Sequence, residues 1–204
     1  MLKTSLLSIF VTLATVPPAL AQSNSLNTFA DWCNNQNNLA PGARHTVEII
    51  LQRVDIQDCD RAQQALAATS SLRLSDSELT DLAPLASLTH LTDLTLSYNQ
   101  ITDLTPLANL TRLKELNLDE NNVVDITPLA GLTQLQDLDL DHNDVKDITI
   151  LAGLTNLDTL WLYGNQIEDI SPLTGLTKLT WLELGDNPLP SEYCPVSPAR
   201  ICNF

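Results

Sequence analysis

Leucines recur along this chain with a period of 22 residues. In each period a Leu-x-x-Leu-x-Leu segment is followed by x-x-Asn, and its first leucine falls at Leu91, Leu113, Leu135, Leu157 and Leu179. The alternation x-Leu-x-Leu-x places every second side chain on one face, which is typical of a half-buried strand. An earlier unit is visible from Leu72, so the pattern predicts six short strands in one register.

Polar residues repeat with the same period in the turn after each strand. Asparagine stands at Asn99, Asn121, Asn143, Asn165 and Asn187, and Ser77 takes its place in the first unit. We expect each asparagine to bond the backbone of its turn and to stack on the asparagine of the next coil. Aspartate follows at Asp81, Asp103, Asp125, Asp147 and Asp169. Because every full repeat has one, we expect these aspartates to bond backbone amides rather than to act in catalysis.

A short outer segment is predicted after each aspartate. Thr105-Pro106, Thr127-Pro128 and Ser171-Pro172 have the form of a helix N-cap followed by proline at the first helical position. Ile150 is the one break in the column of prolines. A coil of 22 residues leaves room only for a 3₁₀ or short helical turn there. No coil can bury its apolar face alone, and stacking buries it on both neighbours.

The repeats resemble those of a known family. The Asn-x-Ile/Val-x-Asp-Ile/Leu-x-Pro-Leu units at 99–107, 121–129 and 165–173 resemble the 22-residue leucine-rich repeats of bacterial internalins and related secreted proteins. The resemblance covers roughly residues 70 to 189. It implies an α/β solenoid, a leucine-rich-repeat horseshoe with a parallel β-sheet on the concave face and short 3₁₀ or helical convex segments. It also implies a concave surface that grips another protein.

The ends of the repeat region carry the four cysteines. Cys33 and Cys59 precede it, and Cys194 and Cys202 follow it. Four cysteines in an exported chain argue for disulfides and allow three pairings. Local pairing within each end is favoured, because a solenoid holds its ends too far apart for cross-pairing. Apolar residues at helical spacing after Pro41-Gly42 predict helices over residues 41–68.

The first residues have the form of a secretory signal peptide. Lys3 gives a positive start, an apolar run follows from Leu6 to Val16, and small residues precede a cleavage site near Ala21. The chain is therefore predicted to be secreted or periplasmic. Its expected parts are a signal peptide at 1–21, a helical N-terminal cap at 22–70, the repeats at 71–189 and a disulfide-closed C-terminal cap at 190–204. The repeats comprise five full units and a final half-unit.

Acidic side chains gather at the centre of the predicted concave face. The chain has a formal net charge of −15, which disfavours nucleic acid and anionic membranes and favours a protein partner with a basic patch. Outward strand positions collect Glu115, Asp119, Glu120, Asp137, Asp139 and Asp141. Strands lie about 4.8 Å apart, so these charges crowd one another. Two interpretations stay open: a site that steers a cationic partner, or a solvated face that keeps the protein soluble.

Aromatic side chains gather beside this acidic centre. Trp161, Tyr163 and Trp181 fall at outward positions of two neighbouring coils, and Tyr98 lies at an outward position of an earlier coil. Interface hot spots are enriched in Trp and Tyr, which predicts a partner-binding surface. Two alternatives remain: the rings pack on the C-terminal cap near Tyr193, or they stack a sugar ring.

Catalytic and metal chemistry is not predicted. Asp137-x-Asp139-x-Asp141 resembles the start of a calcium loop, but His142 and Ile148 stand where that loop needs Gly and Glu. No nucleophile and base can be paired among the residues, and a shallow face is not expected to shift a carboxyl pKa as an acid–base pair needs. The sequence thus predicts a binding protein that is not an enzyme, with no cofactor and no membrane insertion. The alternative functions are a carbohydrate- or calcium-binding surface, and a structural or inhibitory protein acting on an exported enzyme.

Overall fold

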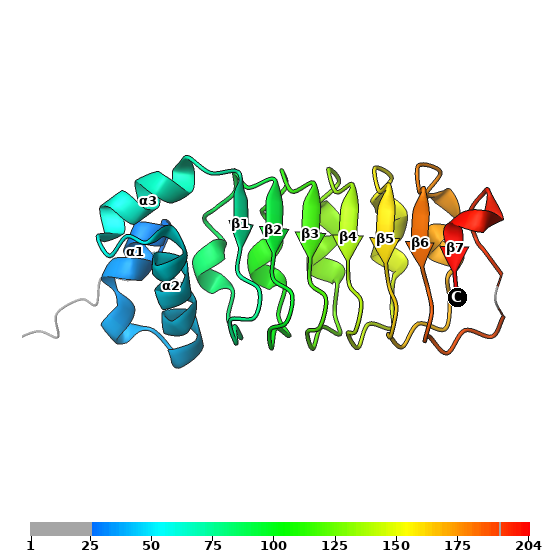
Figure 1. Cartoon of the computed structure of the whole chain (residues 1–204), viewed down its shortest axis with the longest axis horizontal. Helices are drawn as coiled ribbons and strands as arrows, with labels where there is room; N and C mark the ends of the chain where they lie inside the picture. The colour runs from blue at the N-terminus through cyan, green and yellow to red at the C-terminus, as the bar shows by residue number, and fades with distance from the viewer. Residues whose placement is uncertain (1–25, 192) are drawn as a thin grey trace, which may run out of the picture.

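The computed structural model describes residues 26–191 and 193–204, and the predicted signal peptide lies outside them. Seven strands form one parallel sheet in chain order: β1 (Ser71–Arg73), β2 (Asp93–Thr95), β3 (Glu115–Asn117), β4 (Asp137–Asp139), β5 (Thr159–Trp161), β6 (Trp181–Glu183) and β7 (Cys202–Asn203). Figure 1 shows the strands side by side, with short turns of helix behind them. The predicted solenoid is therefore confirmed.

The repeat leucines set the register of the sheet. Leu94 pairs with Leu116, which pairs with Leu138, and each of these side chains is almost fully buried. Each buried leucine contributes about 1.5–3 kcal/mol relative to an exposed one. The residues on either side of each leucine point away from the core and are exposed or half-buried. This face of the sheet is the predicted concave face.

A 3₁₀ turn forms the outer segment of each coil. These turns span Ala83–Leu85, Thr105–Leu107, Thr127–Gly131, Thr149–Gly153 and Ser171–Gly175. The turn that lacks proline, with Ile150 in its place, has the same length as its neighbours. Proline therefore favours the turn without being needed for it.

The predicted capping role of the threonines is wrong. Thr105 is the first residue of its turn and makes no side-chain cap. Its backbone N–H instead donates to Oδ1 of Asp103 at 2.8 Å, and the same bond recurs from Thr127 to Asp125. The aspartate two residues earlier satisfies the orphan amide, because its short side chain reaches two residues ahead.

Three helices close the N-terminal end of the sheet (Figure 1): α1 (Phe29–Asn34), α2 (Pro41–Val54) and α3 (Cys59–Ala67). The last two lie where helices were expected, whereas α1 was missed because six residues are too few for a periodic pattern. The Cys33–Cys59 disulfide joins α1 to α3. Thr46 Oγ1 donates to the carbonyl of Asp81 at 2.6 Å, which ties this cap to the first coil.

A short strand closes the other end. The Cys194–Cys202 disulfide forms the predicted local loop. The sequence did not reveal that Cys202 and Asn203 then pair in parallel with β6 as β7. This pairing satisfies backbone groups that β6 would otherwise leave open at the edge of the sheet. No helix in the described ranges is long and apolar enough to cross a membrane.

Candidate functional site

The concave face consists of the outward side chains of β1–β6 and of the two residues after each inner leucine. The parallel register places these side chains in straight rows across the coils. One row runs through Asn117, Asp139, Trp161 and Glu183, which are successive register partners on β3 to β6. Residues at equivalent outward positions of successive repeats therefore lie next to one another in rows on this face, as the sequence predicts.

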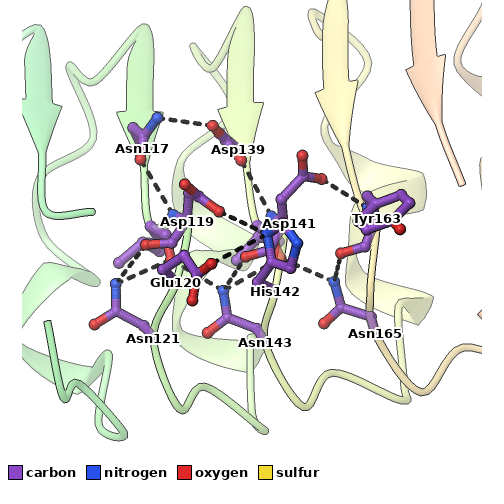
Figure 2. A network of polar contacts seen from close by, with 12 residues as sticks. Asn117, Asp119, Glu120, Asn121, Asp139, Asp141, His142, Asn143, Tyr163 and Asn165 are labelled. Carbon is purple, nitrogen blue, oxygen red and sulfur yellow. Dashed lines mark hydrogen bonds and ion pairs between the residues drawn. The ribbon is translucent and has the colours of Figure 1, made fainter. Parts of the chain in front are cut away.

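The acidic centre is a connected network of hydrogen bonds (Figure 2). Asn117 Nδ2 donates to Oδ2 of Asp139 at 2.7 Å, and Asp139 Oδ1 accepts the backbone N–H of Asp141 at 3.1 Å. Asp141 Oδ1 accepts the backbone N–H of Tyr163 at 2.6 Å. The carboxylates of β4 and its following turn are thus held in place from both neighbouring coils.

Burial raises the pKa of the inner carboxyls. For Asp139, burial raises the pKa to about 7, and the hydrogen bond from the backbone N–H of Asp141 offsets part of this rise. Burial also raises the pKa of Asp141 to about 6 and moves those of Glu115 and Asp137 upward, with neighbouring acids adding to the rise. The expectation that this face leaves carboxyl pKa values unshifted is wrong, because flanking side chains shield the row.

His142 and Tyr98 lie at the edge of the acidic centre. Nδ1 of His142 lies 3.1 Å from Oδ1 of Asp119 and 3.8 Å from Oε1 of Glu120. The hydrogen bond with Asp119 raises the pKa of His142, which favours its charged form. The charge of Asp119 likewise raises the pKa of the Tyr98 hydroxyl. His142 is thus the one basic group that the described residues place in ion-pair range of the acidic centre.

The aromatic residues form a second cluster next to the acidic centre. The ring centroids of Trp161 and Trp181 lie 5.4 Å apart, with the ring planes tilted by 39°. Trp181 keeps 40% of its surface exposed and Tyr163 keeps 38%, whereas Trp161 is half-buried. The rings therefore remain open to solvent beside the C-terminal cap, where Tyr193 is itself 72% exposed.

A hollow of about 230 Å³ lies at the other end of the face. Its walls include Arg73, Asp93, Thr95, Glu115 and Asp137, from β1 to β4. Arg73, Asp93 and Thr95 were not among the residues predicted to bind a partner. They occupy the same outward columns, so the signal was present, but a single basic residue among acids gave no reason to choose them.

The repeated polar residues of the turns serve the backbone. Nδ2 of Asn143 donates to the carbonyls of Leu118, Leu140 and Asp141, and its Oδ1 accepts the N–H of Val123 at 2.9 Å. The equivalent asparagines in the neighbouring coils make the same bonds. The expected backbone role of these residues is confirmed. Within the described ranges, no three His, Cys, Asp or Glu side chains are grouped so as to hold a metal ion.

The fold and this surface define a class of protein: a short leucine-rich solenoid, capped at both ends, with a polar and aromatic concave face. A model of the family "Leucine Rich repeats (2 copies)" matches residues 70–109, 111–153, 133–175 and 155–192. The chain belongs to the leucine-rich-repeat family, and its repeats are internalin-like.

Solved structures support this assignment. An internalin (inlF) of Listeria monocytogenes is 42% identical, with a TM-score of 0.59 over 62% of this chain and 38% of that one. Internalin C2 (inlC2) of the same species is 31% identical, with a TM-score of 0.58 over 83% of this chain and 94% of that one. The chain thus spans well under two thirds of the first relative and nearly all of the second.

A plant protein shares the fold more distantly. The peptide hormone receptor RGFR1, in complex with RGF2, is 26% identical, with a TM-score of 0.53 over 59% of this chain and 21% of that one. A comparison with curated protein sequences finds no match.

Proposed function

We propose that this chain is a protein-binding module whose partner lies along the concave face, over β3 to β6. The observation that carries this proposal is the difference between repeated and unrepeated polar residues. Asparagines and aspartates recur in the turns of successive coils and bond the backbone. The outward residues of the strands change from coil to coil, and no repeated structural role explains the exposed Trp181 or the row formed by Asp93, Glu115 and Asp137.

The chemistry of the face supports a basic partner. Burial and mutual repulsion raise the pKa values of Asp137, Asp139 and Asp141, so carrying negative charge on this face without a partner is unfavourable in free energy. A partner with a basic patch relieves that cost and is steered toward the face by the net charge of the chain. The aromatic cluster supplies the apolar contact area that such an interface needs.

Two further observations fit this proposal. The plant peptide hormone receptor RGFR1, which shares the fold, forms a complex with RGF2. The two disulfides fit an oxidising compartment. We therefore infer that the chain is exported, as its first 21 residues predict, and that it acts by binding without catalysis.

Affinity capture tests the proposal. The full chain with a C-terminal tag is offered proteins from culture supernatant and periplasm, beside the double variant Trp161→Ala/Trp181→Ala and the control Glu168→Gln. Glu168 is exposed and lies outside the concave face, in an ion pair with Lys146 at 2.6 Å. The proposal predicts a protein that the wild type and the control retain and the double variant loses.

The salt dependence of association tests whether the acidic charge steers the partner toward the concave face. A basic partner should associate several-fold more slowly when the ionic strength rises from about 0.05 to 0.5 M, because the screening length shortens. If every captured protein survives the double substitution at full yield, the concave face is not the binding site and the proposal is wrong.

A further inference from the structure

The C-terminal third of the concave face combines aromatic rings and carboxylates in one cluster. We define the aromatic–carboxylate cluster as Asp139, Trp161, Tyr163, Trp181 and Glu183. Three of its members share one row, because Asp139 is the register partner of Trp161 and Trp161 is the register partner of Glu183. The half-buried indole of Trp161 therefore lies between two acidic side chains, one on each neighbouring strand.

The second indole of the cluster, that of Trp181, lies next to the indole of Trp161. Trp181 lies on β6, diagonal to Trp161, at a centroid separation of 5.4 Å and a tilt of 39°. The two rings touch at this separation, and we call the solvent-facing surface that the pair forms the recess. Trp181 is 40% exposed, so the recess opens to solvent.

A glycine makes room for the third ring. A Cβ at Gly185 would lie 2.9 Å from Cδ2 of Tyr163 and 3.2 Å from Oε1 of Glu183. Only the absence of a side chain lets the phenol ring and the carboxylate approach that point together. Gly185 thus places Tyr163 and Glu183 side by side at the margin of the recess.

The carboxylates of the cluster have no internal cation. Within residues 26–191 and 193–204, the ion pairs involve only His142 and Lys146 as bases, and neither pairs with Asp139 or Glu183. Asp139 uses one acceptor site on each oxygen, for Asn117 and for the amide of Asp141. A carboxylate offers about four such sites, so further donors can be accepted.

We propose that the aromatic–carboxylate cluster is the receptor for an arginine side chain of the partner protein, with the guanidinium stacked on Trp161 and its edges bonded to Asp139 and Glu183. Tryptophan is the best aromatic partner for a cation, and Trp181, which contacts Trp161, extends the aromatic surface beside the stacked group. The inference rests on the proposed protein-binding role of the concave face.

The shape of the recess selects arginine over lysine. Strands lie about 4.8 Å apart, so the backbones of β4 and β6 lie roughly 10 Å apart across Trp161. A planar guanidinium presents N–H donors at both edges and can bond two carboxylates while it lies flat on an indole. An ammonium group is a compact point charge with three donors, and it has no plane that can lie flat on an indole.

Tryptophan fluorescence reports on the cluster directly. The chain has three tryptophans, and Trp32 in the N-terminal cap is the one outside the cluster. In a Trp32→Phe background, N-acetyl-arginine amide is titrated at constant ionic strength. Its neutral isostere N-acetyl-citrulline amide, N-acetyl-lysine amide and maltose are titrated in parallel. We expect a saturable change with the arginine probe, a several-fold weaker response to lysine, and none to citrulline or maltose.

Isosteric variants assign the response to the carboxylates. Glu183→Gln and, separately, Asp139→Asn should each weaken arginine binding roughly tenfold, the effect of losing a charge-assisted hydrogen bond. Glu168→Gln is the matched control, since Glu168 is an exposed acid outside the concave face, and it should change affinity less than twofold. The far-ultraviolet circular dichroism spectrum of each variant checks that the solenoid is intact.

Several results would overturn the inference. Equal responses to the citrulline and arginine probes would show that the cluster does not recognise the positive charge. A stronger response to maltose would show that the cluster binds a sugar. If the folded Glu183→Gln variant binds the arginine probe as strongly as the wild type, the carboxylates do not bind the guanidinium. If the arginine probe fails while a captured protein still requires Trp161 and Trp181, this inference falls and the protein-binding role stands. If the probe binds but no captured protein depends on these residues, the arginine site stands and that role falls.

Discussion

Two regions of the solenoid, the turns and the concave face, contain aspartates whose carboxyls behave in opposite ways. In the turn, Asp125 and Asp147 lie in water and accept hydrogen bonds from Thr127 and Thr149, which hold the pKa of each aspartate below its usual range. On the concave face, burial raises the pKa of Asp139 to about 7. The turn therefore stabilises the charged carboxylate, and the concave face opposes it.

This difference distinguishes the turn aspartates, which stabilise the fold, from the concave aspartates, which the fold accommodates at an electrostatic cost. The turn aspartates and asparagines satisfy backbone groups that would otherwise be unpaired, so their charge and polarity stabilise the solenoid. On the concave face, Asp139 and Asp141 accept the backbone N–H groups of Asp141 and Tyr163, but their charges keep an electrostatic cost in the absence of a partner. The account predicts that substitutions in the two regions have opposite effects on stability and on binding.

The largest loss of stability is expected for Asn143→Ala. The substitution leaves the buried N–H of Val123 without its acceptor and removes one of the two donors from each of three carbonyls, which should cost about 2–3 kcal/mol of unfolding free energy. Urea unfolding followed by circular dichroism measures the loss. Asn122→Ala is the matched control, because Asn122 is exposed, and a similar loss there would show that the asparagine column is not what holds the turns.

The next effect is a dependence of stability on pH that comes from Asp139. An unfolded aspartate has a pKa near 3.8, whereas the folded value is about 7. Between these values the folded chain holds a proton that the unfolded chain has released, so stability should fall as pH rises from about 4 to 7 and then level off. Solvent screening limits the contribution to about 1–2 kcal/mol.

Asp139→Asn should flatten this slope, measured by urea unfolding at several pH values. The neutral side chain keeps an acceptor for the amide of Asp141 but no longer titrates. A slope that is unchanged in the variant would assign the pH dependence to the neighbouring Asp141, whose pKa is also raised, to about 6.

A smaller effect of opposite sign is expected for the turn aspartates. The pKa of Asp125 is lowered, so its contribution to stability is present above the unfolded value near 3.8 and is lost as pH falls through the folded value. Asp125→Ala should lower the Tm modestly at pH 7 and less at pH 3, measured by calorimetry. Asp125→Asn, which retains the acceptor for Thr127, should stay closer to the wild type at pH 7; equal losses would mean that the hydrogen bond is unimportant.

The last prediction concerns Trp181→Ala on the concave face, where the main effect falls on binding. The side chain is 40% exposed, so its truncation should cost about 1–2 kcal/mol of stability. The same substitution should weaken partner binding at least tenfold, as for an interface hot spot. A variant that unfolds readily but still binds would reverse the assignment of Trp181 to the interface.

The sequence predicted the repeated parts of the molecule well, because one period explains them all. The leucine register, the asparagine column and the backbone role of Asp103 follow from spacing and short-range hydrogen bonding. Some features that occur once were missed. The pairing of Cys202 with β6 depends on how the last loop folds back, which no local pattern encodes.

The sequence predicted which candidate residues share the concave face, but not how deeply their side chains are buried. Counting outward positions brought Trp161, Trp181 and Asp139 to one surface, and the structure places them in adjacent rows. Their burial could not be read from the sequence, since it depends on which side chains flank them. The pKa of Asp139 and the place of Tyr163 over Gly185 are consequences of that packing.

Hydrogen–deuterium exchange with a captured partner tests the central claim most directly. The claim is that the concave face binds and the turns support it. The account predicts slower exchange on binding in the segments around β4, β5 and β6, at residues 137–141, 159–163 and 181–185, with the 3₁₀ turns at 127–131, 149–153 and 171–175 unchanged. Protection confined to those turns or to the N-terminal helices, with the three strand segments unaffected, would contradict it.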